Sequence, residues 1–169
     1  MARNIEIKAR VSDLAALEER AVAIGARRVG VENQTDRYFE IGAARRFKLR
    51  AIDGVRTELI RYARPEHSGV RLSEYEITRV SSEETELSSV LSSKPLVIVR
   101  KRRTIYLLDN VRIHLDEVDG LGTFLELEAV VDPNHDEARC RAQIDEIMSG
   151  LGIDQTTLLQ ASYADLLEK

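Results

Sequence analysis

Ionisable side chains alternate with apolar ones on two neighbouring strand-like runs in the sequence RIHLDEVDGLGTFLELE. Side chains two residues apart on a β-strand point to the same face, so this alternation gathers the ionisable groups on one face. Those groups are Arg112, His114 and Asp116 on the first run and Glu126 and Glu128 on the second. Carboxylate oxygens are the ligands that hard cations prefer, and arginine binds phosphate through two parallel hydrogen bonds.

The same alternation recurs in three other short segments, NIEIKAR, RRFKLR and VRKRR. Their ionisable side chains share faces as the pairs Glu6/Lys8, Lys48/Arg50 and Lys101/Arg103. The opposite faces are apolar and suit a surface packed beneath helices: Ile5/Ile7, Phe47/Leu49, Ile113/Leu115 and Leu125/Leu127. In VRKRR both faces are basic, so periodicity cannot choose between the pair Lys101/Arg103 and the pair Arg100/Arg102.

Two interpretations fit these charged faces. In a half-exposed sheet they would face solvent, which is the ordinary place for charge. In a closed barrel they would line the interior, and the apolar faces would point outward beneath helices. Burying a charge without a partner is costly, so such an interior needs a compensating ligand. A highly charged anion with a divalent metal would serve, because basic side chains would hold the anion and carboxylates the metal.

Seven or eight strand-like runs fill most of the chain. They are expected at 4–11, 34–41, 45–52, 56–64, 71–80, 97–108, 110–118 and 123–131. Helices are expected at 12–26 with Ser12 as N-cap, at 81–93, at 134–150 ended by Gly150, and at 155–168. Short connections favour antiparallel pairing. The fold class is therefore α+β, with a sheet that folds over or closes into a barrel.

Composition limits the class of protein. The chain has 169 residues, 43% of them hydrophobic and 32% charged, which suits one folded domain over residues 1–169. No apolar run reaches about 18 residues and no signal-peptide pattern is present, so we expect a cytoplasmic protein without membrane contact. The net charge of −4 argues against a nucleic-acid-binding protein. The single cysteine, Cys140, cannot form an internal disulfide.

Nearly the whole chain resembles, in motif order and spacing, the CYTH proteins, also called triphosphate tunnel metalloenzymes. This family includes class IV adenylate cyclases and thiamine triphosphatases. The matching segments, in chain order, are NIEIKAR, QTDRYF, FKLR, ELIRYARP, VRKRRTIY, RIHLDEVDGLGTFLELE and ASYADLL. The resemblance implies an eight-stranded antiparallel β-barrel, or tunnel, with flanking helices. It also implies a small-molecule triphosphate as partner and Mg²⁺ or Mn²⁺ as cofactor.

Carried over position by position, the resemblance implies roles for individual residues. Lys8 would activate the attacking group. The phosphate contacts would be Lys48, Arg50, Arg61, Lys101, Arg103 and Arg112, so the resemblance selects the first of the two basic pairs in VRKRR. The metal ligands would be Glu6 and Glu128, then Glu126, with Asp116 completing the acidic wall.

One position departs from the family pattern. The first glutamate of the Glu-x-Glu-x-Lys signature is Asn4 here. An amide oxygen can coordinate a metal ion but carries no charge. We therefore expect weaker metal binding, or the loss of one position in a site that elsewhere holds two ions.

Three functions stay open at this point. A triphosphatase acting on inorganic tripolyphosphate, thiamine triphosphate or a nucleoside triphosphate stands slightly ahead, because hydrolysis demands less positioning than cyclisation. A class IV adenylate cyclase, which would convert ATP to cyclic AMP and pyrophosphate, is the alternative. A non-catalytic module that binds polyphosphate or nucleotide is the third possibility, favoured by Asn4. The sequence does not distinguish a monomer from a homodimer.

Overall fold

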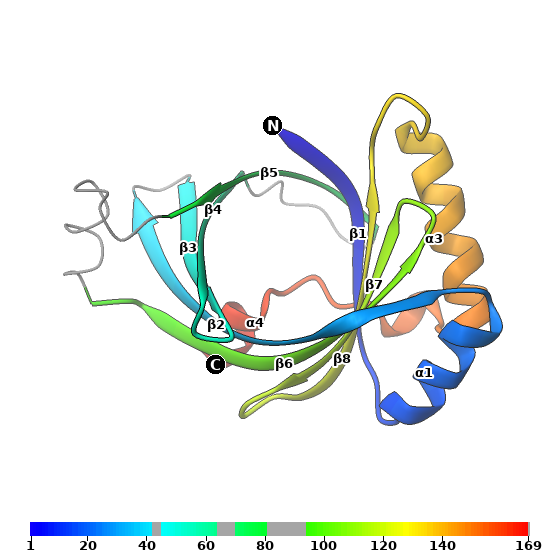
Figure 1. The fold of residues 1–169 in the computed structure, drawn as a ribbon, viewed down its shortest axis with the longest axis horizontal. Helices are drawn as coiled ribbons and strands as arrows, with labels where there is room; N and C mark the ends of the chain where they lie inside the picture. Colours follow the sequence, from blue (N-terminus) through cyan, green and yellow to red (C-terminus); the bar gives the residue numbers. More distant parts are fainter. Residues whose placement is uncertain (42–44, 64–69, 81–93, 169) are drawn as a thin grey trace.

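Eight antiparallel strands close into a barrel in the computed structural model, which describes residues 1–41, 45–63, 70–80 and 94–168 (Figure 1). The strands are β1 Ala2–Arg10, β2 Arg27–Ile41, β3 Arg45–Ile52, β4 Arg56–Ala63, β5 Arg71–Arg79, β6 Val97–Leu108, β7 Val111–Val118 and β8 Gly122–Val130. The helices in these ranges are α1 Leu14–Ala23, α3 Glu137–Leu151 and α4 Tyr163–Leu167. The predicted α+β class and the eight-stranded barrel are confirmed.

Strand order around the barrel is β1-β5-β4-β3-β2-β6-β7-β8, with β8 returning to β1. Hairpins supply five of the eight neighbour pairs, and the pairs β1·β5, β2·β6 and β1·β8 join strands that are distant in the chain. Closure leaves no free sheet edge. It also gives every strand an inner and an outer face.

The apolar faces point outward, and those of β1, β7 and β8 are covered by helices. Ile5 and Ile7 of β1 form one buried cluster with Leu127 of β8, Leu17 of α1 and Ile144 of α3. In Figure 1, α1 and α3 lie against one side of the barrel, outside β1, β7 and β8. The solvent-face interpretation of the charged strand faces is wrong, because these side chains line the interior of the barrel or are buried in its wall.

The hairpin between β3 and β4 follows the predicted Asp-Gly signal. Asp53 has a φ of 50° and Gly54 a φ of 70°. Two successive positive φ values are those of a type I′ turn, whose twist matches that of the flanking strands. The Asp53 carboxylate also accepts a hydrogen bond from the Asn33 backbone N–H at 2.9 Å, which ties the turn to β2.

The C-terminal segment covers one end of the barrel. Tyr163 of α4 packs in a buried cluster with Tyr38, Val99 and Phe124. The Leu159 backbone N–H donates to the Lys8 carbonyl at 2.8 Å, which ties the approach to α4 to β1. The segment crosses the barrel opening in Figure 1. It therefore forms a floor for the interior.

Several predicted helix boundaries are wrong, and local hydrogen bonds explain why. Asp13, not Ser12, is the N-cap of α1, with its side chain accepting from the Ala16 N–H at 3.0 Å. Helix α3 ends beyond Gly150, at Leu151, because Gly152 provides the left-handed C-cap with φ 69°. The predicted helix 155–168 is split into a 3-10 turn at Gln155–Thr157 and the short α4.

The break in that last helix has a tertiary cause. Leu158 forms an isolated β-bridge with Ala9, and this pairing with β1 replaces helical hydrogen bonds. Strand β2 starts earlier than predicted because residues 27–33 pair with β6 through an irregularity between Arg28 and Gly30. The predicted helix at 81–93 lies outside the described residues. No helix among the described residues is long and apolar enough to cross a membrane.

Candidate functional site

The barrel encloses a cavity of about 330 Å³ whose wall is charged. Among the described residues, eight basic and five acidic side chains line it. The accessible surface therefore carries excess positive charge, although the whole chain has a net charge of −4. A cavity of this kind suits a small polyanion.

Three basic side chains converge on a single buried carboxylate, that of Asp36 on β2. Arg50 donates to both Asp36 oxygens, at 2.7 and 2.8 Å. Lys101 and Lys48 approach the same carboxylate at 3.0 and 3.2 Å. Burial alone would raise the pKa of Asp36, but these cations hold it well below its usual value of 3.8. We call Asp36 and these three cations the cationic wall.

The pKa of Lys101, one cation of this wall, lies far from its ordinary value. Its side chain is 2% exposed. Burial, with repulsion from Arg50, Arg103 and Lys48, lowers the pKa of Lys101 to about 7, and the Asp36 carboxylate limits the fall. Its charge at neutral pH therefore depends on what occupies the cavity.

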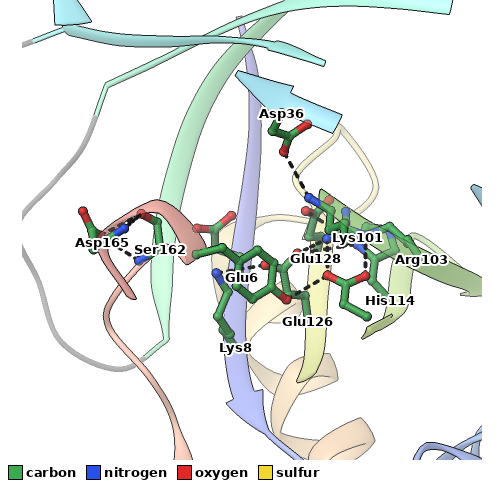
Figure 2. Close-up of polar contacts among 12 residues, drawn as sticks. Glu6, Lys8, Asp36, Lys101, Arg103, His114, Glu126, Glu128, Ser162 and Asp165 are labelled. Atoms are coloured by element: carbon green, nitrogen blue, oxygen red, sulfur yellow. Dashed lines mark hydrogen bonds and ion pairs between the residues drawn. The ribbon is translucent and has the colours of Figure 1, made fainter. Parts of the chain in front are cut away.

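An acidic wall faces the cavity from β1 and β8. Glu6 pairs across the strands with Glu128, and Glu126 lies two residues away on the same face (Figure 2). Burial and repulsion from Glu128 and Glu126 raise the pKa of Glu6 against the opposing effect of Arg71. The pKa of Glu126 moves the other way, because Lys8 and Arg103 overcome the effect of burial.

Three side chains of this region could hold a metal ion together. Ligand atoms of His114, Glu126 and Glu128 all lie within 4.8 Å of one another. The Oδ1 atom of Asn4, a residue that also lines the cavity and is 2% exposed, makes no hydrogen bond. Carboxylates beside buried polar atoms without partners suit a divalent cation. Glu126 and Glu128 are thus brought together as predicted, and Glu6 lies on the same wall but outside this group.

Lys8 lies between the acidic wall and the floor. Its Nζ is 3.0 Å from Glu126 Oε1 and 3.7 Å from the centroid of the Tyr163 ring. Lys101 lies over the same ring at 5.4 Å. A cation above an aromatic face is stabilised electrostatically, so Tyr163 helps to keep both ammonium groups at the base of the cavity.

Asp116 occupies a different place from the one predicted. It is fully buried and does not line the cavity. Arg103 donates to both of its oxygens, at 2.7 and 2.6 Å, and the Tyr163 hydroxyl donates to Oδ2 at 2.8 Å. Both oxygens of Asp116 are therefore bound by protein groups and neither faces the cavity. The structure thus places Asp116 as a support for Arg103, whose Nη2 atom also contacts Glu126.

Arg61 also differs from its predicted position. It is exposed, and its neighbours in register are Phe47 and Glu76, which lie on the outer face. Alternation along β4 turns Glu58 and Ile60 inward instead. The other predicted phosphate contacts all line the cavity: Lys48, Arg50, Lys101, Arg103 and Arg112. Arg100 and Arg102 are exposed, so of the two basic pairs of VRKRR it is Lys101 and Arg103 that face the cavity.

Three contributors to the cavity were missed by the sequence-based prediction. Asp36 lies in QTDRYF, and its parity with Gln34 and Tyr38 on β2 could have placed it inside. Arg71 pairs with Glu6 and donates to the Gln160 carbonyl at 3.0 Å, but nothing local distinguishes it from a surface arginine. The third is Tyr163 of α4, whose ring centroid lies 3.7 Å from Lys8 Nζ, and strand alternation carries no information about a helical residue.

Comparisons with known proteins agree with this geometry. A family model described as CYTH domain matches residues 2–163. A protein of Methanocaldococcus jannaschii named "Putative adenylate cyclase MJ0240" is 26% identical over 171 residues, or 96% of this chain and 97% of that protein. The solved structure of PH1012 from Pyrococcus horikoshii OT3 has a TM-score of 0.83 at 25% identity, over 96% of this chain and 98% of that chain.

A more distant structure shares the fold. It is that of HpAC1 from Hippeastrum, with a TM-score of 0.66 at 16% identity, covering 96% of this chain and 93% of that chain. The match of the family model to nearly the whole sequence, together with the closed barrel and its charged interior, shows that this chain belongs to the CYTH domain family.

Proposed function

We propose that the protein is a divalent-metal-dependent triphosphatase that hydrolyses a triphosphate bound inside the barrel. The observation that carries this proposal is the opposition of two walls across one cavity of about 330 Å³. Lys48, Arg50 and Lys101 supply positive charge on one wall, and carboxylates gather on the other. A triphosphate with its metal needs both.

The chemistry follows from this arrangement. Hydrolysis would join a water oxygen to the terminal phosphorus and break that atom's bond to the bridging oxygen, releasing orthophosphate and diphosphate. A bound divalent ion neutralises charge on the transferred phosphoryl group. The loose transition state of this reaction depends on positioning and electrostatics, so the fixed cations would stabilise its equatorial oxygens.

Lys8 remains our proposed residue for activating the attacking water. Its Nζ is held by Glu126 at 3.0 Å and is 5% exposed, so it is buried within the charged region of the cavity. From there the ammonium group can position a water molecule by donating a hydrogen bond to one lone pair of its oxygen. The other lone pair would attack the terminal phosphorus, and the water's proton would pass to a phosphate oxygen. The acidic residues Glu126 and Glu128 would hold the metal, with Glu6 beside them.

Adenylate cyclisation is the second candidate, because the Methanocaldococcus jannaschii relative carries that name. One comparison supports hydrolysis over cyclisation. The Hippeastrum protein of the same fold is described as having a dominant triphosphatase activity, so the barrel can support hydrolysis.

Product analysis separates the candidates. The purified protein is incubated with tripolyphosphate, thiamine triphosphate or ATP and Mg²⁺ or Mn²⁺, and the products are separated by chromatography. Orthophosphate release supports the triphosphatase, and cyclic AMP with pyrophosphate would establish the cyclase instead. If no product forms while tripolyphosphate raises the melting temperature, the protein is a binding module, and Asn4→Glu is the variant to assay next.

Two basic residues on adjacent strands allow a controlled test of phosphate binding. Lys48 on β3 faces the cavity, and Arg61 on β4 faces outward. Lys48→Met is expected to weaken tripolyphosphate binding by about tenfold to a hundredfold, because a charge-assisted hydrogen bond contributes about 1.5–3 kcal/mol. Arg61→Met removes a positive charge from the outer face of the adjacent strand and is expected to leave binding unchanged. Isothermal titration calorimetry measures both. Equal losses in the two variants would show that only overall charge matters.

Binding of tripolyphosphate should also load a proton onto Lys101. With a pKa of about 7, Lys101 is mostly neutral at pH 8 in the free protein, and a nearby polyanion raises that pKa. Proton uptake is therefore expected at pH 8 and should be small at pH 6, where Lys101 is already charged. Calorimetry in buffers of different ionisation enthalpy measures it. In the variant Lys101→Arg the side chain is charged at both pH values, so any proton exchange it shows comes from the ligand and is subtracted. Equal proton uptake in the wild type and the variant would contradict the role of Lys101.

A further inference from the structure

The imidazole of His114 is a buried group of the cavity wall for which phosphate binding gives no role. The residue is 5% exposed and lines the cavity from β7. Its Nδ1 atom makes no hydrogen bond. Buried nitrogen atoms almost always have a partner, so one without a protein partner that faces a cavity is available to a bound group.

The strand register sets what that nitrogen faces. His114 pairs directly with Glu126 across the β7·β8 ladder, and Glu128 lies on the diagonal. Directly opposed side chains on a sheet are the closest pairs, and diagonal ones lie within reach of longer side chains. The three side chains therefore converge from one face of a two-stranded ribbon (Figure 2).

The distances fit shared ligation better than direct hydrogen bonding. Nδ1 of His114 lies 3.9 Å from Glu126 Oε2 and 3.8 Å from Glu128 Oε1. Hydrogen bonds between such atoms would be at most about 3.2 Å long. Two ligands that each lie about 2.1 Å from one ion can be up to about 4.2 Å apart. Both distances therefore allow one ion to contact Nδ1 together with a carboxylate oxygen, and ligand atoms of all three residues lie within 4.8 Å of one another.

We propose that His114 Nδ1 is a metal ligand beside Glu126 and Glu128, and that this nitrogen donor shifts the preference of the cavity from Mg²⁺ toward first-row transition ions. Mg²⁺ takes oxygen ligands, whereas imidazole is a common ligand of transition metals. The inference rests on the divalent metal of the proposed function. It adds the identity of one ligand and the class of ion that this ligand selects.

The basic neighbours of these carboxylates change the affinity of the site for a cation but leave carboxylate oxygens accessible to it. Lys8 contacts Glu126 Oε1, and Arg103 contacts Glu126 Oε2, so both oxygens are shared. Arg112 lies 3.3 Å from Glu128 Oε2, which leaves Oε1 directed toward His114. These positive charges lower the affinity for a free cation. A bound polyanion would offset them, so metal and triphosphate should strengthen each other's binding.

Pulsed EPR of bound Mn²⁺ tests the ligand directly, without triphosphate and without turnover. Wild-type protein should show a ¹⁴N coupling to Mn²⁺ that changes to the ¹⁵N pattern when histidine is ¹⁵N-labelled. This comparison needs no substitution. The coupling should vanish in His114→Asn, which offers an amide oxygen in place of the nitrogen. It should persist in the control His135→Asn, which alters a histidine held by Asp132 and Asp109 away from the cavity.

Calorimetry on the same proteins tests selectivity. In His114→Asn the ratio of Mn²⁺ to Mg²⁺ affinity should fall at least about tenfold, since even the partners of metal ligands contribute that much. Three results would each overturn the inference. They are Mn²⁺ bound without nitrogen coupling, coupling that survives in His114→Asn, and no binding of Mn²⁺. Metal-dependent hydrolysis by a protein without nitrogen coupling would refute this inference alone. Nitrogen coupling in a protein that hydrolyses nothing would refute only the proposed function.

Discussion

Asp36→Asn is expected to lower the free energy of unfolding by about 3–5 kcal/mol, because it leaves buried cations without their counter-ion. Arg50, Lys48 and Lys101 all pair with this fully buried carboxylate. Tripolyphosphate should restore much of the loss, since the polyanion brings negative charge to the same cations. The melting temperature of the variant should therefore rise more on adding tripolyphosphate than that of the wild type.

The pH dependence of this effect has a defined sign. The pKa of Asp36 is depressed in the folded protein, so its contribution is present above the unfolded value of about 3.8 and is lost as pH falls below it. The difference in stability between wild type and Asp36→Asn should consequently shrink in acid. Chemical denaturation at several pH values measures this difference.

Two controls separate charge compensation from a general packing defect. Asp145→Asn removes a carboxylate from the exposed face of α3 and should change stability little. The double variant Asp36→Asn/Arg50→Met removes one uncompensated cation, the guanidinium bound to both Asp36 oxygens, and should recover part of the loss, because a neutral pair is less costly than an unpaired buried charge. If Asp36→Asn alone is as stable as the wild type and tripolyphosphate raises its melting temperature no further, Asp36 does not compensate these buried cations.

Glu128→Gln is expected to reduce kcat/KM for the triphosphate by about 10²–10³-fold, the loss typical of removing one electrostatic stabiliser of a transition state. Despite burial, the neighbouring side chains of His114, Arg112 and Arg103 lower the pKa of Glu128, so the carboxylate is ionised at neutral pH and its charge is available to a metal. The amide keeps the shape of the side chain and removes that charge. Steady-state rates at several metal concentrations measure the effect.

Excess metal should recover part of the Glu128→Gln activity, because weakened binding of the ion is one cause of the loss. Glu117→Gln is the matched control, since Glu117 is exposed and pairs with Arg102 on the outside of the barrel. Its rate should equal that of the wild type. Similar losses in both variants, or full activity in Glu128→Gln, would contradict a metal-binding role for Glu128.

Much of the barrel was readable from the sequence, because period-two alternation is a local property of each strand. The pairs Ile5/Ile7 and Leu125/Leu127 were expected on an outer face under helices, and that is where they pack. The Asp53-Gly54 turn followed from its residue types. Even the choice of Lys101 over Arg100, which alternation left open, followed from the order of the family motifs.

Other features were decided only by the closure of the barrel. Which carboxylate meets which cation depends on register between strands distant in sequence, so Asp36 as a counter-ion on β2 for cations of β3 and β6 was not predictable locally. The same holds for Asp116, whose oxygens are bound by Arg103 and by Tyr163 from α4. Arg61 fits a family motif in sequence, but the alternation of β4 turns it outward.

The sequence by itself determined which side chains share a strand face, and its family motifs predicted a triphosphate and a metal as ligands. The tertiary structure decided which of those side chains meet. His114 becomes a candidate ligand because β7 and β8 pair in one register that places it opposite Glu126. The physical reason is that charges interact through space, at distances set by closing the barrel, and alternation along a single strand carries no information about its partners.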